Sequence, residues 1–240
     1  MSKSLGVLYT VFNEKNAVDF SIKKLKEVYP DIPVYLVSDG GHDFSYLENE
    51  YTNIKANMDV DTMGATFKIT DKNFKEEVHQ KSMKKCSLAV LERLDKCIEY
   101  CNTDYILMMD PDTLVRGELN IPDGAKLLGS RINKGFPDKF KKTLTKVPGG
   151  ISINHWGATP AIFEVESFKK AYSVLKDNMD VYDELCMSFY AMYAHDVLLP
   201  TLYALIGIEE TFNPNIVECS RNKNWKKTTH PLVHQFKEYY

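Results

Sequence analysis

The stretch Tyr105-Ile106-Leu107-Met108-Met109-Asp110-Pro111-Asp112-Thr113 decides how the chain folds. Its first five residues are apolar and end in a polar turn, a pattern that predicts a fully buried central strand. The carboxylates of Asp110 and Asp112 therefore follow the carboxyl end of a strand. In open α/β sheets that edge is where ligands bind.

The Asp-Pro-Asp turn has the chemistry of a metal site. Pro111 favours an extended backbone at Asp110, and two carboxylates separated by one residue on an extended chain can point to the same side. Like charges this close repel each other unless a cation lies between them, and carboxylate oxygens suit Mg²⁺ or Mn²⁺. We therefore predict a metal site here, although Asp-Pro-Asp is also common chemistry for an ordinary turn.

The alternation of apolar segments around this strand predicts an α/β fold with a central, mostly parallel mixed sheet flanked by helices. We expect strands at residues 5–11, 34–37, 105–109, 125–129, 151–154 and 161–165, and helices at 17–28, 79–101, 167–176, 180–194 and 197–206. Residues 43–78 show no convincing period and are expected to be irregular, with a helical turn or two. The lysines of 134–146 suggest a loop. Because no repeat or linker is visible, one domain is the simpler interpretation.

Composition indicates a soluble globular protein. The 240 residues are 44% hydrophobic and 26% charged, and 30 basic residues nearly balance 33 acidic ones. This balance gives no reason to expect nucleic-acid binding. The 5 cysteines lack zinc-site spacing and are expected to be reduced thiols. No signal peptide or transmembrane segment is recognised, so we expect a cytoplasmic protein whose membrane association, if any, is peripheral.

Five short features, in this order, resemble glycosyltransferases of the GT-A fold that use nucleotide sugars. They are Asp39 after the second strand, the D-x-D motif Asp110-Pro111-Asp112, the segment 156–163 around Gly157, Asp196 heading a helix, and the late His234 with Lys237. In size and style the chain is similar to small virally encoded members. The resemblance implies a single GT-A domain over residues 1–240, with a nucleotide-binding half at about 1–115 and an acceptor-binding half at about 116–240.

The resemblance also implies a role for each site residue. Asp110, Asp112 and His234, with His230 as the alternative, would hold Mn²⁺ or Mg²⁺ against the leaving diphosphate. Asp196 would be the general base of an inverting transfer. The residues assigned to the nucleotide or donor are Thr10, Val11, Asp39, Lys84, Asp110, Pro111, Gly157 and Lys237, with Lys141 and Lys142 as further cations. Trp156 and His195 are assigned to the acceptor.

The expected donor is a nucleoside diphosphate sugar, with UDP favoured by family frequency alone, and the expected acceptor is a glycan or glycoprotein. The chain departs from the family by carrying His195 where an acid often lies, which leaves Asp196 as the one acid at the proposed base. Structural alternatives stay open: Asp196 as a helix N-cap, His234 as a histidine without a ligand, and Thr10 as a strand-end residue.

Two other functions compete with the glycosyltransferase interpretation. An apolar strand followed by Asp-x-Asp-x-Thr is also typical of haloacid-dehalogenase-type phosphatases, in which Asp110 would be the nucleophile and Asp112 the acid/base. Such chains normally open with this motif, whereas here it follows a complete βαβ unit. The second alternative is a non-catalytic module that binds a sugar nucleotide or a glycan.

Overall fold

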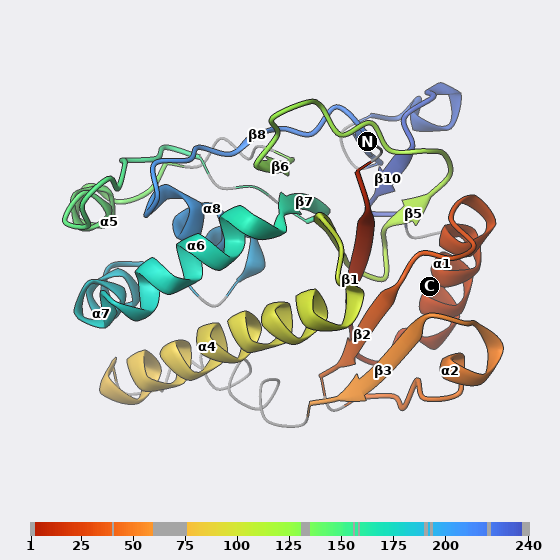
Figure 1. Ribbon diagram of the computed structural model, residues 1–240, viewed down its shortest axis with the longest axis horizontal. Coiled ribbons are helices and arrows are strands. Elements are labelled where there is room, and N and C mark those ends of the chain that lie inside the picture. Colours follow the sequence, from red (N-terminus) through yellow and green to blue (C-terminus); the bar gives the residue numbers. More distant parts are fainter. Residues whose placement is uncertain are drawn as a thin grey trace.

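A mixed seven-stranded sheet forms the centre of the protein (Figure 1). This computed structural model describes residues 3–39, 41–59, 76–130, 135–155, 157, 159–189, 192, 194–219 and 222–236. The strand order is β3-β2-β1-β4-β7-β6-β8. The strands are β1 (Leu5–Val11), β2 (Val34–Ser38), β3 (Ile54–Met58), β4 (Tyr105–Met109), β6 (Leu127–Gly129), β7 (Ala161–Glu164) and β8 (Thr211–Phe212). The predicted fold class is confirmed.

The centre of the sheet contains a topological switch point. β1 pairs in parallel with both β2 and β4, so the chain leaves β1 toward one side of the sheet and later continues on the other. Tyr9 of β1 is in register with Met109 of β4, and the carboxyl ends of these strands lie side by side. A switch point of this kind is where open α/β sheets bind ligands. β7 is antiparallel to β4, and its register pairs Met108 with Ala161.

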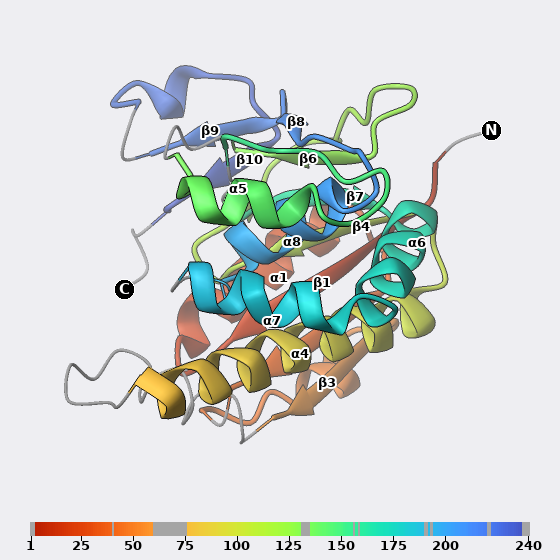
Figure 2. The ribbon, with the colours of Figure 1, turned by 90° about the vertical axis from the view of Figure 1, so that its left-hand side faces the viewer.

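Helices cover both faces of the sheet, because alternate strand residues carry apolar side chains to each face. On one face, α1 (Lys15–Val28) and α2 (Leu47–Glu50) share a core with Val7, Tyr9 and Met109. On the other face, Leu8 and Met108 pack with the remaining α-helices, which lie in front of β1 in Figure 2. These are α4 (Glu76–Cys101), α5 (Asp138–Leu144), α6 (Val165–Lys176), α7 (Met179–Ser188) and α8 (His195–Ala204). None of the helices in the described ranges combines the length and the apolar character that a membrane crossing requires.

A second, three-stranded sheet joins the C-terminal segment to the chain that follows Asp112. It consists of β5 (Leu114–Val115), β10 (Leu232–His234) and β9 (Ile216–Glu218), with β10 in the middle. Arg116 reinforces it, because its guanidinium donates to the carbonyl oxygens of Thr228 at 2.6 Å and His230 at 2.7 Å. The guanidinium also reaches the carbonyl of Trp225, at the start of the 3₁₀ helix η1 (Trp225–Lys227).

The predicted strands at the centre of the sheet and most predicted helices are confirmed. Several predictions for other segments are wrong. The bounds of β1 and β4 are as predicted. The predicted lysine loop contains α5 instead, because Phe140 and Leu144 lie one helical turn apart and bury completely while the lysines stay outside. β3 was missed, no strand forms at 151–154, and α7 ends at Ser188. β8, β9 and β10 were also missed.

Lys26 is a buried cation that connects three segments. Its side chain is 8% exposed, and its ammonium donates to the carbonyl oxygens of Pro30 (3.3 Å), Ile32 (2.7 Å) and Thr52 (3.1 Å). The amine thereby joins the end of α1 to the approaches of β2 and β3. Burial lowers the pKa of this amine from its usual value.

We expect Lys26→Met to lower the free energy of unfolding by about 1–3 kcal/mol, because three carbonyl oxygens lose their charged donor. The measurement is urea denaturation followed by circular dichroism. Lys23→Met is the matched control, since Lys23 is an exposed lysine of the same helix. Equal midpoints for the two variants would contradict a structural role for the buried ammonium.

Candidate metal and donor site

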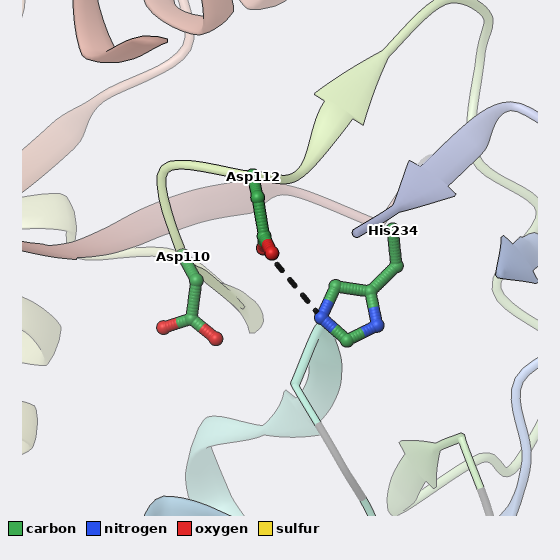
Figure 3. A group of neighbouring side chains, drawn as sticks. All are labelled: Asp110, Asp112 and His234. Carbon is green, nitrogen blue, oxygen red and sulfur yellow. Dashed lines mark ion pairs between the residues drawn. The ribbon is translucent and has the colours of Figure 1, made fainter. Parts of the chain in front are cut away.

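Asp110, Asp112 and His234 form a cluster at the carboxyl edge of the sheet (Figure 3). One ligand atom from each residue lies within 4.8 Å of the other two. His234 Nε2 is 3.7 Å from Asp112 Oδ1, and the histidine is buried. Two carboxylates and one imidazole form a donor set that a divalent ion of the Mn²⁺ type accepts, and the imidazole makes Mg²⁺ a poorer match. Among the described residues, the cluster contains His234 and does not contain His230.

The turn that carries the two aspartates is held from several directions. The amide of Phe236 donates to the carbonyl oxygen of Asp112 at 2.9 Å. On the other side, the hydroxyl of Ser21 on α1 donates to the carbonyl oxygen of Thr113, and Tyr9 donates to Ser21 in turn. Tyr9, Ser21 and Thr113 are all buried. The backbone of the turn is therefore fixed before any ligand binds.

The Asp110 carboxyl lies in an environment that disfavours its charge. Desolvation raises its pKa, and the neighbouring carboxylates of Asp112 and Glu14 raise it further. A hydrogen bond from Thr159 and the proximity of His234 act in the opposite direction. A bound divalent cation would reverse this balance, because it would be the largest charge in the site.

Asp196 lies in the first turn of α8 and is connected to the cluster through Thr159. The N-cap position of α8 belongs to Ala194, so Asp196 is not the N-cap itself. Its Oδ1 accepts the backbone amide of Thr159 at 2.9 Å, and the Thr159 hydroxyl donates to Asp110 Oδ2 at 2.5 Å. The proposed base and a proposed metal ligand thus share one neighbour.

The residues assigned to the nucleoside lie at the ends of β1 and β2. The buried Oγ1 of Thr10 has no hydrogen-bond partner among the described residues. The Val11 carbonyl accepts the amide of Asp39 at 2.9 Å. The Asp39 carboxylate pairs with the buried guanidinium of Arg93, which also donates to Asp59 at 3.1 Å. Thr10, Val11 and Asp39 therefore lie next to one another at the carboxyl ends of β1 and β2, and their assignment to the nucleoside stays a prediction.

Arg93 and Asp59 also line a cavity of about 750 Å³ between β2, β3 and α4. Its mixed lining of apolar, acidic and basic side chains does not define one ligand chemistry.

Other predicted site residues lie in different surroundings. Lys84 forms a 2.5 Å ion pair with Asp183 of α7, and its assignment to the nucleotide stays a prediction. Lys141 and Lys142 lie on α5, where Lys141 is 3.7 Å from Asp138. Trp156, Lys237 and the side chain of His195 lie outside the described residues.

Sequence reasoning missed Thr159, Glu14 and Arg93. Glu14 follows β1, and its carboxylate accepts the amides of Phe12 (3.2 Å) and Asn13 (3.0 Å) close to Asp110. Arg93 lies in the predicted helix 79–101, and the sequence analysis assigned it no role. The signal that could have found it is its place as a charged residue among the buried positions of α4. Thr159 carries no such signal, because only the antiparallel register of β7 brings it to Asp110.

Comparison with known proteins places the fold among glycosyltransferases. No protein-family model and no curated protein sequence matches the chain. The galactosyltransferase LgtC, solved in complex with donor and acceptor sugar analogs, aligns with a TM-score of 0.51 and 13% identity over 97% of this chain and 87% of LgtC. The glycosyltransferase GlyE of Streptococcus pneumoniae TIGR4 aligns with a TM-score of 0.52 and 9% identity over 98% of this chain. This chain spans only 56% of GlyE. At these identities the likeness defines a shared fold.

Gly157, assigned to the donor, has a structural reason to be glycine. A Cβ at this position would lie 2.2 Å from Oε1 and 2.3 Å from Oε2 of Glu210, and the Glu210 side chain is buried. Gly129 meets the same carboxylate from β6, where a Cβ would lie 2.2 Å from Oε1. The Glu210 carboxylate therefore fills the space that side chains at these two glycines would need.

We expect Gly157→Ala to lower the free energy of unfolding by about 1–3 kcal/mol, because the added methyl group must displace a buried carboxylate. Gly135→Ala is the matched control, since no atom of the described residues lies within 4 Å of a Cβ built there. Thermal unfolding of both variants measures the difference. Equal stability of the two proteins would show that the Glu210 carboxylate can move aside without cost and that packing does not require glycine at position 157.

Proposed function

We propose that the protein is a metal-dependent glycosyltransferase that moves a sugar from a nucleoside diphosphate sugar, with UDP as the expected nucleotide, to an acceptor hydroxyl. The observation that carries the proposal is the Asp110–Asp112–His234 cluster at the carboxyl edge of β4. It lies beside the switch point of a sheet whose fold is found in LgtC and GlyE. The LgtC structure holds donor and acceptor sugar analogs, which supports a donor and an acceptor for this chain as well.

The cluster would serve the leaving group. Asp110, Asp112 and His234 would hold Mn²⁺ or, less favourably, Mg²⁺, and the ion would supply positive charge where the diphosphate gains negative charge. Thr10, Val11 and Asp39 would bind the nucleoside, because they lie at the carboxyl ends of β1 and β2, on the same edge as the end of β4. Arg93 would keep the Asp39 carboxylate oriented from α4.

The proton of the acceptor hydroxyl would go to Asp196. Its Oδ1 accepts the Thr159 amide, which holds the carboxylate beside the metal cluster. A base in this position gives an inverting transfer, in which the hydroxyl attacks from the face opposite the leaving diphosphate. A glycan or glycoprotein is the acceptor class that we propose.

The first test is calorimetric titration of nucleoside diphosphates in Mn²⁺, in Mg²⁺ and in chelator. We expect UDP to bind in Mn²⁺. Its affinity should fall at least about tenfold in chelator and in Asp112→Ala, because both prevent binding of the divalent ion whose positive charge offsets the diphosphate. Asp123→Ala is the matched control, since its carboxylate is fully exposed. Equal binding in Mn²⁺ and in chelator would contradict metal dependence, and the absence of any nucleotide binding would contradict the transferase.

The second test concerns the base. In Asp196→Asn the side-chain oxygen can still accept the Thr159 amide, but the carboxamide cannot act as a base. We therefore expect kcat to fall by roughly 10²–10⁴-fold and the nucleotide affinity to stay unchanged. The measurement is turnover of the donor found in the first test, with the anomeric configuration of the product read by NMR. Asp180→Asn is the control, because Asp180 is an exposed acid in the first turn of α7. Unchanged kcat, or a product with retained configuration, would remove Asp196 from the role of base.

A further inference from the structure

Thr159 lies between the two functional parts of the proposed site. It lies two residues before the start of β7, and because β7 is antiparallel to β4, the amino end of β7 lies at the carboxyl end of β4. The register pairs Met108 with Ala161, so the residues just before β7 meet the residues just after β4. Thr159 is 6% exposed.

The two polar groups of Thr159 have different partners. Its hydroxyl donates to Asp110 Oδ2 at 2.5 Å, whereas its backbone amide donates to Asp196 Oδ1 at 2.9 Å. The hydroxyl lies 3.4 Å from the same Asp196 oxygen. A hydroxyl has one proton to donate, and the shorter contact to a carboxylate is the stronger hydrogen bond.

Each of the two carboxylates therefore has one oxygen bound to Thr159. Fixing Oδ2 of Asp110 restricts the rotation of a carboxylate that belongs to the Asp110–Asp112–His234 cluster. Fixing Oδ1 of Asp196 does the same for the proposed base. Groups held in this way need less ordering when a ligand binds.

Among the described residues, the cavity that Thr159 lines is too small for a sugar. Together with Asp196, Gly157 and Glu210, Thr159 lines a cavity of about 10 Å³, which is about the space of one water molecule. Its effect must therefore pass through its two neighbours.

We propose that Thr159 is a positioning residue that couples the metal cluster to the base: its hydroxyl orients Asp110 for the ion and its amide orients Asp196 for the acceptor. The inference rests on the proposed function and assigns a role to a residue of the segment 156–163 for which the family resemblance named none. It predicts that the hydroxyl matters for the affinity of the ion and that the amide keeps Asp196 in place when the hydroxyl is removed.

The test compares Thr159→Val with Thr159→Ser. Valine keeps the branched shape and the amide but lacks the hydroxyl, whereas serine keeps the hydroxyl. For Thr159→Val we expect the dissociation constant of Mn²⁺, measured by calorimetry without nucleotide, to rise about 10-fold to 100-fold, as for the loss of a hydrogen bond to a charged group. We expect kcat to fall at limiting Mn²⁺ and to recover largely at saturating Mn²⁺, with the KM for the acceptor unchanged. Thr159→Ser should stay within about threefold of wild type, since its hydroxyl can make the same bond.

Thr143→Val is the control for loss of a buried hydroxyl, because Thr143 is 2% exposed and its hydroxyl donates to the Lys139 carbonyl within α5. It should leave Mn²⁺ affinity unchanged. If Thr159→Val does not fold, Thr159→Ala is read in its place.

The outcomes distinguish failure of the proposed role of Thr159 from failure of the proposed glycosyltransferase function. Wild-type Mn²⁺ affinity in the valine variant would overturn the role of Thr159 and leave the transferase standing. An equal loss in the serine and valine variants would also overturn it, since packing and not the hydroxyl would be responsible. Absence of Mn²⁺ binding in the wild-type protein would overturn both proposals.

Discussion

The pairing of β10 with β5 is the contact on which the candidate site depends. Asp112 and His234 are distant in the sequence, and they meet because Val233 is in register with Leu114 directly after the aspartate turn. The amide of Phe236 then bonds the Asp112 carbonyl, and Arg116 holds the preceding segment by its carbonyl oxygens. Closing so long a loop costs conformational entropy, which the buried side chains of Leu232, Val233 and Phe236 offset. An ion bound by His234 and the aspartates would stabilise the same pairing, because it binds the folded chain only.

Electrostatics explain why this turn needs so many fixed donors. Asp110, Asp112 and Glu14 place three carboxyl groups near one another, and the pKa of Asp110 is raised as a result of its burial and these neighbours. Hydrogen bonds from Thr159 to Asp110, and from backbone amides to Glu14, compensate part of the cost. Compensation by neutral donors is incomplete, whereas a divalent cation would neutralise the carboxylates directly. These carboxylates are the groups that we propose to hold the cation, and Ser21 keeps the turn in place through the Thr113 carbonyl.

The sequence predicted the parts of the fold that local patterns control. The apolar run before Asp110 could only be buried, and β4 has the predicted bounds. The helical period of α1 and α4 was equally readable. β8, β9 and β10 could not be predicted, because each has only two or three residues. Such short strands are defined by pairing with a partner strand and not by a sequence pattern of their own. The same limit applies to the site. Asp110 and Asp112 follow from their spacing and His234 from the resemblance, but Thr159 acts through a register that no local pattern encodes.

The antiparallel direction of β7 explains how two halves of the chain supply one site. A parallel strand beside β4 would bring its own carboxyl end to the ligand-binding edge, and the segment before it would lie at the far end of the sheet. Because β7 is reversed, the loop that carries Gly157 and Thr159 enters at the edge where β4 ends, and Asp196 reaches it from the first turn of α8. Asp110 follows β4, and Asp196 is tied through Thr159 to the segment that enters the neighbouring strand β7. The separation of Asp110 and Asp196 is therefore set by strand pairing and by the hydrogen bonds of Thr159.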